Sequence, residues 1–134
     1  MSKFDRYAFS ASPSFDEAET REAFSHAVPL KTLVIYCYDP REAEIPQAVA
    51  KLFGDEVFPG QIILDDSGNR VASSTTMFPV IVAGGCAIDA LRSITVAQHL
   101  FGIENVVVVH HSHCGATSFT VDGIMDAYKK RAPH

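Results

Sequence analysis

The fold of this chain is decided by the stretch KTLVIYCYDPR at residues 31–41. It begins with a near-continuous run of β-branched and apolar side chains, which is typical of a strand buried on both faces of a sheet. A second such run belongs to the stretch VVVVHHSHC at residues 106–114. Each buried run therefore leads directly into side chains that can carry chemistry. These are two thiols, an imidazole, and a carboxylate close to a guanidinium.

Helical patterns alternate with the buried runs along the rest of the chain. Strands that alternate with helices predict an α/β fold, with a mostly parallel β-sheet flanked by helices. The predicted helices span 14–26, 42–53 and 88–101, with a last helix from Gly115 onward, and the predicted buried strands span 31–38, 78–83 and 106–109. In such sheets ligands bind beyond the carboxyl ends of the strands. Both reactive motifs fall at that end.

Two segments lie outside this alternation. Residues 1–13 are predicted to be an arm with three aromatic side chains, which packs on its own domain or on a partner subunit. The helix after the arm is expected to begin at a capping box, Ser14 to Glu17. Residues 61–64 and 71–75 flank the polar stretch DDSGNR and predict either a hairpin or a long polar turn. We treat 1–134 as a single domain, with 1–26 as its N-terminal arm and first helix.

Composition and charge exclude several classes of function. The net charge is -5, and no cluster of Lys and Arg offers a footprint for nucleic-acid phosphates. No apolar run approaches the ~20 residues that span a membrane, and the first residues resemble neither a secretory signal nor a transit peptide. Three cysteines make a poor disulfide framework, which favours metal binding or reactivity in a reducing compartment. We therefore expect a cytoplasmic protein that binds neither nucleic acid nor membrane.

The two motifs together predict a zinc site. Cys37, His111 and Cys114 offer two thiolates and one imidazole, the ligand set of a catalytic zinc with a fourth position left open. These ligand types favour zinc over magnesium, calcium or manganese. Zinc lowers the pKa of bound water to ~7 and so supplies hydroxide at neutral pH. Asp39, kept ionised by Arg41, would stand beside the open position and orient that hydroxide.

Each of these residues also has a plainer interpretation. Cys37 and Cys114 could be buried apolar thiols, and His111 could be a histidine with its hydrogen bonds satisfied at a strand end. Asp39 could cap a helix, with Arg41 as its surface ion pair. What favours the metal is that the whole set falls at the ends of two strands.

The pattern C-x-D-x-R followed by H-x-x-C-G resembles the β-class carbonic anhydrases. Further segments look like the smaller branch of that class, which also contains carbonyl sulfide hydrolases: AGG at 83–85, DALRS at 89–93 and HHSHCG at 110–115. The resemblance is good over residues 31–53 and 78–120. It is highly specific for the zinc site and much less specific for the substrate.

The resemblance implies one Zn²⁺ per chain, held by Cys37, His111 and Cys114, with Asp39 and Arg41 as the catalytic dyad. It implies a parallel sheet extended by one antiparallel strand. Family members assemble as dimers in which the N-terminal arm wraps over the partner, so we expect a homodimer or a dimer of dimers. In some members the aspartate occupies the fourth zinc position and closes the site.

Several departures from the family pattern bear on the substrate pocket. Ile81 and Val82 stand where the family usually has Arg-Asn, which predicts a more apolar pocket. His113 replaces an aspartate of the branch and could relay protons, since its unperturbed pKa is ~6.5, or could be a surface side chain. Gly84 and Gly115 are expected to complete the pocket.

Two further departures concern length. The chain ends about twenty residues after Cys114, so we expect a shortened C-terminus in which the family's last helix and edge strand are largely missing. Residues 59–77 look like an insertion, and we expect their hairpin to cover the sheet surface or edge left open.

Three functions remain after this reasoning. The favoured one is hydration of carbon dioxide to bicarbonate by attack of zinc hydroxide on the central carbon. Hydrolysis of carbonyl sulfide to hydrogen sulfide and carbon dioxide follows closely, because the apolar residues Ile81 and Val82 suit a less polar substrate. The third is a catalytically silent zinc-binding dimeric module.

Overall fold

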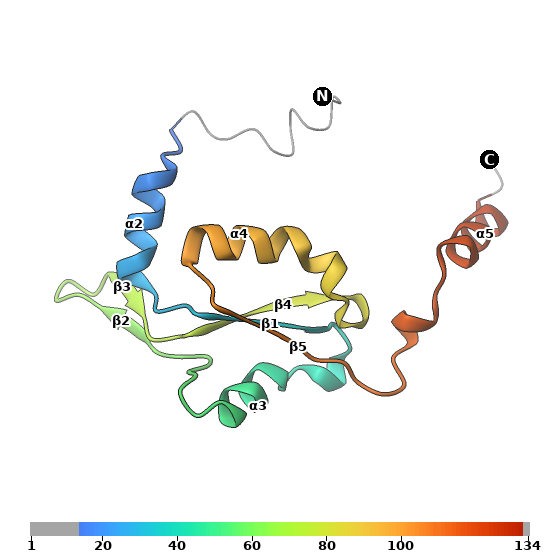
Figure 1. Ribbon diagram of the computed structural model, residues 1–134, viewed down its shortest axis with the longest axis horizontal. Coiled ribbons are helices and arrows are strands. Elements are labelled where there is room, and N and C mark those ends of the chain that lie inside the picture. Colours follow the sequence, from blue (N-terminus) through green and yellow to red (C-terminus); the bar gives the residue numbers. More distant parts are fainter. Residues whose placement is uncertain (1–13, 133–134) are drawn as a thin grey trace.

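The main sheet has three parallel strands in the order β4-β1-β5 (Figure 1). In the computed structural model, which describes residues 14–132, β1 (Thr32–Cys37) is the central strand. β4 (Met77–Val82) and β5 (Asn105–Val108) pair with it in parallel on either side. The predicted arm at 1–13 lies outside the described residues. The predicted α/β fold with a parallel sheet flanked by helices is confirmed.

Four α-helices and four short 3-10 turns complete the described part of the chain. The helices are α2 (Glu17–Ala27), α3 (Ile45–Leu52), α4 (Leu91–Phe101) and α5 (Val121–Arg131). The turns are η1 (Pro40–Glu42), η2 (Ala83–Gly85), η3 (Ala87–Ala90) and η4 (Gly115–Ser118). Figure 1 shows α4 and α3 on opposite faces of the sheet. None of the helices described in residues 14–132 has the length and apolar character needed to cross a membrane.

All six residues of β1 are buried because helices cover both faces of this strand. Successive strand residues point to opposite faces. Leu33 and Ile35 pack in one cluster with Ala97 of α4, and Val34 packs in the other with Val49 of α3. Burying a side chain of this size stabilises a fold by roughly 1.5–3 kcal/mol. The central strand therefore fixes the position of whatever follows it.

Two helices begin later than the sequence predicted. The segment predicted to start a helix at Glu42 forms the single turn η1, and α3 begins at Ile45 with Pro46 in its first turn. Proline suits that position because the first turn of a helix does not use its backbone N–H groups. The cap of α2 is also not the predicted Ser14. The carboxylate of Asp16 accepts a hydrogen bond from the Glu19 N–H at 2.9 Å.

The predicted last helix is divided into η4 and α5. Thr120 separates them and caps α5, since its hydroxyl oxygen accepts a hydrogen bond from the Gly123 N–H at 3.1 Å. α5 stands apart from the sheet at the end of an extended segment (Figure 1). Its apolar side chains are exposed, with Val121 at 78%. This helix therefore presents an apolar stripe that its own domain does not cover.

The predicted hairpin is confirmed, but it does not extend the main sheet. β2 (Ile62–Leu64) and β3 (Arg70–Ser73) pair in an antiparallel sheet of their own. The Asp65 carboxylate closes the turn by accepting hydrogen bonds from the N–H groups of Ser67 and Asn69. β3 lies beside α2. The hairpin pairs with neither β4 nor β5, so it does not extend either edge of the main sheet.

Candidate metal centre

The topology brings the three predicted ligands together at one end of the sheet. Cys37 is the last residue of β1, and the chain that follows the neighbouring strand β5 carries His111 and Cys114. The Sγ atoms of Cys37 and Cys114 lie 3.7 Å apart. The three potential ligand atoms all lie within 4.8 Å of one another. They occupy the carboxyl end of the parallel strands, where α/β sheets bind ligands.

The geometry of these side chains fits a tetrahedral zinc ion. Zinc–sulfur bonds of ~2.3 Å in a tetrahedron place two sulfur atoms ~3.8 Å apart, close to the 3.7 Å found here. The Nε2 atom of His111 is buried and has no hydrogen-bond partner among the described residues. A buried nitrogen without a partner is costly, and a metal ion would satisfy it. Two thiols and one imidazole also match the protein ligands of a catalytic zinc site.

Gly84 and Gly85 allow the backbone of η2 to approach the ligands. The Gly84 N–H donates a hydrogen bond to the Cys37 sulfur at 3.3 Å. Both glycines have φ of +66°, a conformation that side chains disfavour. A Cβ atom on Gly85 would lie 2.7 Å from the Val109 carbonyl oxygen. The two glycines are therefore required by close backbone approach beneath the site.

The ligands alter the pKa of one another. The neighbouring His111 imidazole lowers the pKa of the Cys37 thiol to about 7, and hydrogen bonds from the backbone N–H groups of Asp39 and Gly84 act in the same direction. The Cys37 sulfur in turn raises the pKa of His111. A thiol with a pKa of about 7 is substantially a thiolate at neutral pH, and the thiolate is the form that binds metal.

Asp39 and Arg41 form a bidentate pair beside these ligands. The Arg41 Nε–H donates to Asp39 Oδ1 at 2.9 Å, and Nη2–H donates to Oδ2 at 2.7 Å. The Arg41 backbone N–H adds a third bond to Oδ1 at 3.0 Å. The guanidinium holds the pKa of the Asp39 carboxyl well below its usual range. Asp39 is therefore ionised and fixed in orientation at neutral pH.

A cavity of about 450 Å³ opens at this end of the sheet. The thiol groups of Cys37 and Cys114 and the carboxylate residue Asp39 contribute to its wall. Most of the other lining residues are small or apolar: Tyr38, Pro40, Ala83, Gly115, Ala116, Phe119 and Ile124. The cavity thus combines a charged corner with an apolar wall that comes from η4 and the start of α5.

The predicted pocket residues are distributed differently from the expectation. Gly115 lines the cavity, whereas Ile81, Val82, Gly84 and His113 are not among its lining residues. Val82 packs against the Leu33 cluster beneath α4, and Ile81 is 52% exposed. His113 occupies the left-handed region with φ of +55° and is exposed. Ile81 and Val82 therefore do not provide the expected apolar pocket.

Phe119 and Ile124 supply the apolar side chains that sequence reasoning missed. Both follow the H-x-x-C motif, and both lie in the part of the chain where a single last helix was predicted. The break between η4 and α5 brings them to the metal cavity. In the sequence, these two residues were visible only as apolar positions of that predicted helix, so nothing indicated that they would line a cavity.

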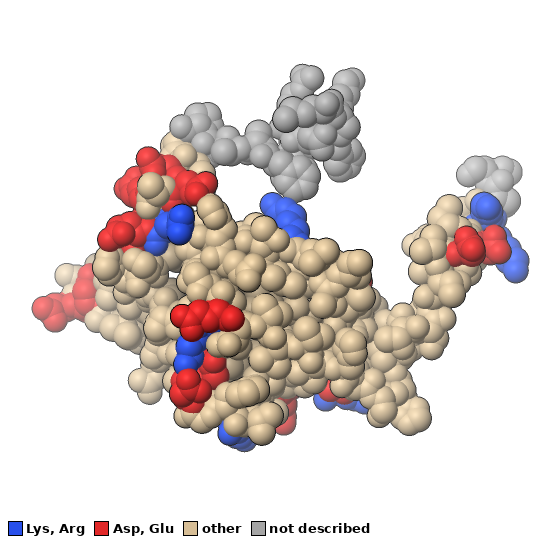
Figure 2. Space-filling model, viewed as in Figure 1, with Lys and Arg blue, Asp and Glu red and all other residues tan. Residues whose placement is uncertain are grey.

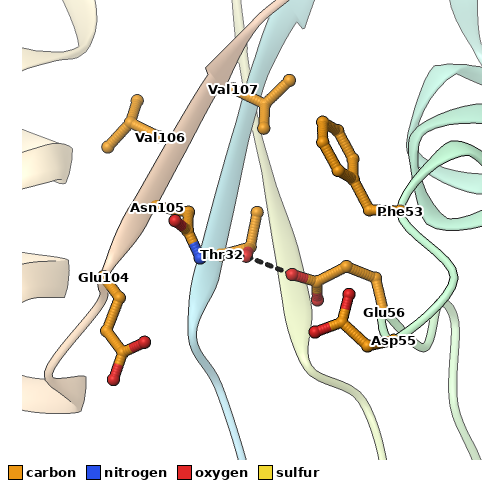
Figure 3. Close-up of a pocket in the computed structure, with 8 residues that line it drawn as sticks. All are labelled: Thr32, Phe53, Asp55, Glu56, Glu104, Asn105, Val106 and Val107. Atoms are coloured by element: carbon orange, nitrogen blue, oxygen red, sulfur yellow. Dashed lines mark hydrogen bonds between the residues drawn. The ribbon is translucent and has the colours of Figure 1, made fainter.

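A second cavity, of about 330 Å³, lies at the opposite end of β1 (Figure 3). Glu56 accepts hydrogen bonds from the hydroxyl groups of Thr32 and Thr76, and Lys31 pairs with Asp55 at 2.5 Å. These bonds tie the loop after α3 to the start of β1 and β4. We interpret this acidic cluster as an anchor for the sheet, at the end remote from the metal ligands.

Together, the parallel sheet and the cluster of Cys37, His111 and Cys114 define an α/β domain with a metal site at the ends of adjacent strands. No protein-family model matches the chain. Two curated relatives, the beta-carbonic anhydrase 1 of Mycobacterium tuberculosis and of Mycobacterium bovis, are 38% identical to it over 45 residues. That match covers 32% of this chain and 28% of each relative.

A structural match covers much more of the chain. A carbonic anhydrase from Glaciozyma antarctica superimposes with a TM-score of 0.52 and 26% identity, over 96% of this chain and 66% of that protein. The partial sequence match, the structural match and the cluster of Cys37, His111 and Cys114 agree in supporting a relationship to the β-class carbonic anhydrases. The family resemblance drawn from the C-x-D-x-R and H-x-x-C-G motifs is thereby confirmed.

Proposed function

We propose that this chain is a zinc enzyme that hydrates carbon dioxide to bicarbonate. The observation that carries the proposal is the cluster of Cys37, His111 and Cys114, two of which line one cavity together with a fixed, ionised Asp39. Zinc bound by these three residues would lower the pKa of a bound water to about 7. One zinc per chain is part of the proposal.

Asp39 and Arg41 have separate roles in this reaction. The Asp39 carboxylate would accept a hydrogen bond from the attacking hydroxide, without taking its proton, and would thereby direct the oxygen lone pair toward the substrate carbon. Both carboxylate oxygens are paired with Arg41, which favours a site in which Asp39 leaves the fourth metal position free. Arg41 has five N–H donors, and those that Asp39 does not use can meet the anionic product.

Carbonyl sulfide is the second candidate substrate. The apolar wall of the cavity, which includes Phe119 and Ile124, favours a substrate less polar than bicarbonate. The sequence favoured carbonyl sulfide because the apolar residues Ile81 and Val82 stand where the family usually has Arg-Asn. That reason no longer supports this substrate, because neither residue lines the cavity. Carbon dioxide therefore keeps precedence, and the two reactions share the same attack on a linear molecule.

Side-by-side turnover of the two substrates, on one preparation with its zinc content measured, tests the proposed function. Rapid hydration of carbon dioxide with little sulfide release supports the proposal. Sulfide release with weak hydration would assign the site to carbonyl sulfide. With zinc bound and neither activity detected, the chain would be a catalytically silent zinc-binding module.

We also propose that the chain forms a homodimer, with a dimer of dimers as a further possible assembly. α5 carries an exposed apolar stripe at helical spacing, formed by Val121, Ile124, Met125 and Tyr128. Figure 2 shows charged side chains on this helix near its far end, and a largely uncharged body between small groups of charged side chains. Apolar patches of this kind mark interaction sites.

Because two of the proposed zinc ligands, Cys37 and Cys114, are free thiols, a reducing compartment such as the cytoplasm suits the protein.

A further inference from the structure

Glu42 lies against the imidazole of His111. Its Oε1 atom is 3.5 Å from His111 Nδ1, and the two side chains are only 19% and 9% exposed. Most of the Glu42 side chain is thus removed from water, and a glutamate that leaves water is usually paired. His111 is the one basic side chain within ion-pair distance of this carboxylate in residues 14–132. The burial of Glu42 therefore serves a contact with a predicted metal ligand.

The turn after β1 explains how Glu42 reaches that position. η1 begins at Pro40, after the two residues that follow β1, and the Glu42 N–H donates a hydrogen bond to the Asp39 carbonyl oxygen at 2.9 Å. Asp39 caps the same turn through its bond with the Arg41 N–H. One short turn thus places Asp39 in the cavity wall, while Glu42 approaches the His111 ring from its Nδ1 edge. Glu42 itself does not line the cavity.

The two nitrogens of His111 have different surroundings. Nδ1 lies 3.0 Å from the Ser112 carbonyl oxygen, which can accept its proton, and the carboxylate of Glu42 faces the same nitrogen. Nε2 is buried without a partner in the described residues. A distance of 3.5 Å is too long for a direct hydrogen bond, so Glu42 acts here mainly as a negative charge beside the Nδ1–H group.

We propose that Glu42 is a positioning residue that keeps the proton of His111 on Nδ1 and leaves the Nε2 lone pair directed at the metal position. Histidine ligands commonly donate their second N–H to a carboxylate or carbonyl oxygen, and loss of such a partner weakens metal binding by 10–100-fold. The inference rests on the proposed function only in requiring that a metal occupies this site. Glu42 would therefore support the site through His111, without contacting the substrate or the metal itself.

The test compares Glu42→Gln with Glu44→Gln in zinc-loaded protein. Both variants remove one negative charge, but Glu44 is exposed and makes no capping bond to α3. Because the Ser112 carbonyl oxygen still accepts the Nδ1 proton in Glu42→Gln, we expect excess chelator to remove zinc from this variant faster than from wild type by at most about 10-fold, and from Glu44→Gln at the wild-type rate. In cobalt-substituted protein, the visible absorption bands should shift in Glu42→Gln alone, because the imidazole changes its orientation.

Unchanged zinc release and an unchanged cobalt spectrum in Glu42→Gln would overturn the inference while leaving the proposed function intact. Equal effects in the two variants would also overturn it, because they would indicate loss of general charge. A wild-type protein that binds no zinc would defeat the proposed function and this inference together. Glu42→Leu keeps the comparison available if the Gln variant folds poorly, since it removes the charge and the acceptor at once.

Discussion

Cys37 and Cys114 stand 77 positions apart in the sequence, and their sulfur atoms lie 3.7 Å apart in the folded chain. The parallel pairing of β1 with β5 accounts for this proximity, because the carboxyl ends of the two strands meet at one edge. The separation of the sulfur atoms suits two ligands of one tetrahedral ion. The candidate metal site is thus a direct product of the sheet topology.

Replacement of either Cys37 or Cys114 by serine should abolish stoichiometric zinc binding. A neutral hydroxyl group is a poor replacement for a thiolate ligand, and two protein ligands hold zinc weakly. Metal analysis of the purified variants measures the effect. Cys86→Ser is the matched control, because Cys86 is not part of the ligand cluster, and it should retain zinc. Loss of zinc from the Cys86 variant alone would contradict the assignment.

Asp39→Asn should lower turnover by about 100-fold or more with zinc content unchanged. An amide at this position cannot accept the same charge-assisted bonds from Arg41, nor hold the attacking water in the same orientation. Steady-state rates normalised to bound zinc report the loss. Asp89→Asn removes an exposed carboxylate in η3 and should keep wild-type turnover. An active Asp39→Asn variant would remove Asp39 from the mechanism.

Gly85→Ala should destabilise the fold by about 2 kcal/mol. The added Cβ meets the Val109 carbonyl oxygen at 2.7 Å, and the residue has φ of +66°, so neither the backbone nor its neighbour can relax freely. Urea unfolding gives the difference in free energy. Gly54→Ala, which finds no atom within 4 Å of its new Cβ, should be close to neutral. Equal midpoints for the two variants would contradict this account of η2.

Zinc affinity should fall more steeply with decreasing pH below pH 7 than above it. The pKa of the Cys37 thiol is lowered from 9.0 to about 7, so the thiolate is present above pH 7 and is lost as pH falls through that value. Zinc must then displace a proton from this ligand, which costs about tenfold in affinity per pH unit. Chelator competition between pH 6 and 8 measures the slope. A constant slope across this range would show that the Cys37 thiol does not titrate near 7.

Met125→Glu should shift the assembly from dimer to monomer. Met125 belongs to the exposed apolar stripe of α5, and a charge at the centre of an apolar interface opposes association. Sedimentation analysis gives the mass directly. Lys130→Glu changes a charged residue of the same helix outside the stripe and should leave the assembly unchanged. A wild-type protein that is monomeric at micromolar concentration would contradict the proposed dimer.

The sequence was most informative where a residue pattern is characteristic of a single kind of structure or site. Buried parallel strands consist of continuous apolar runs, so β1, β4 and β5 could be predicted within one or two residues. Thiols and an imidazole at strand ends are specific for metal binding, and the structure brings Cys37, His111 and Cys114 together.

Sequence reasoning was least informative where the direction of a side chain depends on tertiary structure. β4 continues through Val82, so Val82 points into the core and the cavity wall begins only at Ala83. Phe119 and Ile124 line the cavity because the chain breaks between η4 and α5, and the apolar pattern alone favoured an unbroken helix. Glu42 was assigned to a helix start, so its contact with His111 could not be anticipated.

X-ray absorption spectroscopy at the zinc edge tests the central claim most directly, because it counts the ligands of the bound metal. The account predicts two sulfur ligands at ~2.3 Å, one imidazole nitrogen at ~2.0 Å and one further light atom. Replacement of His111 by alanine should remove the imidazole signal. A metal with no sulfur ligand, or with one or four of them, would contradict the site formed by Cys37, His111 and Cys114.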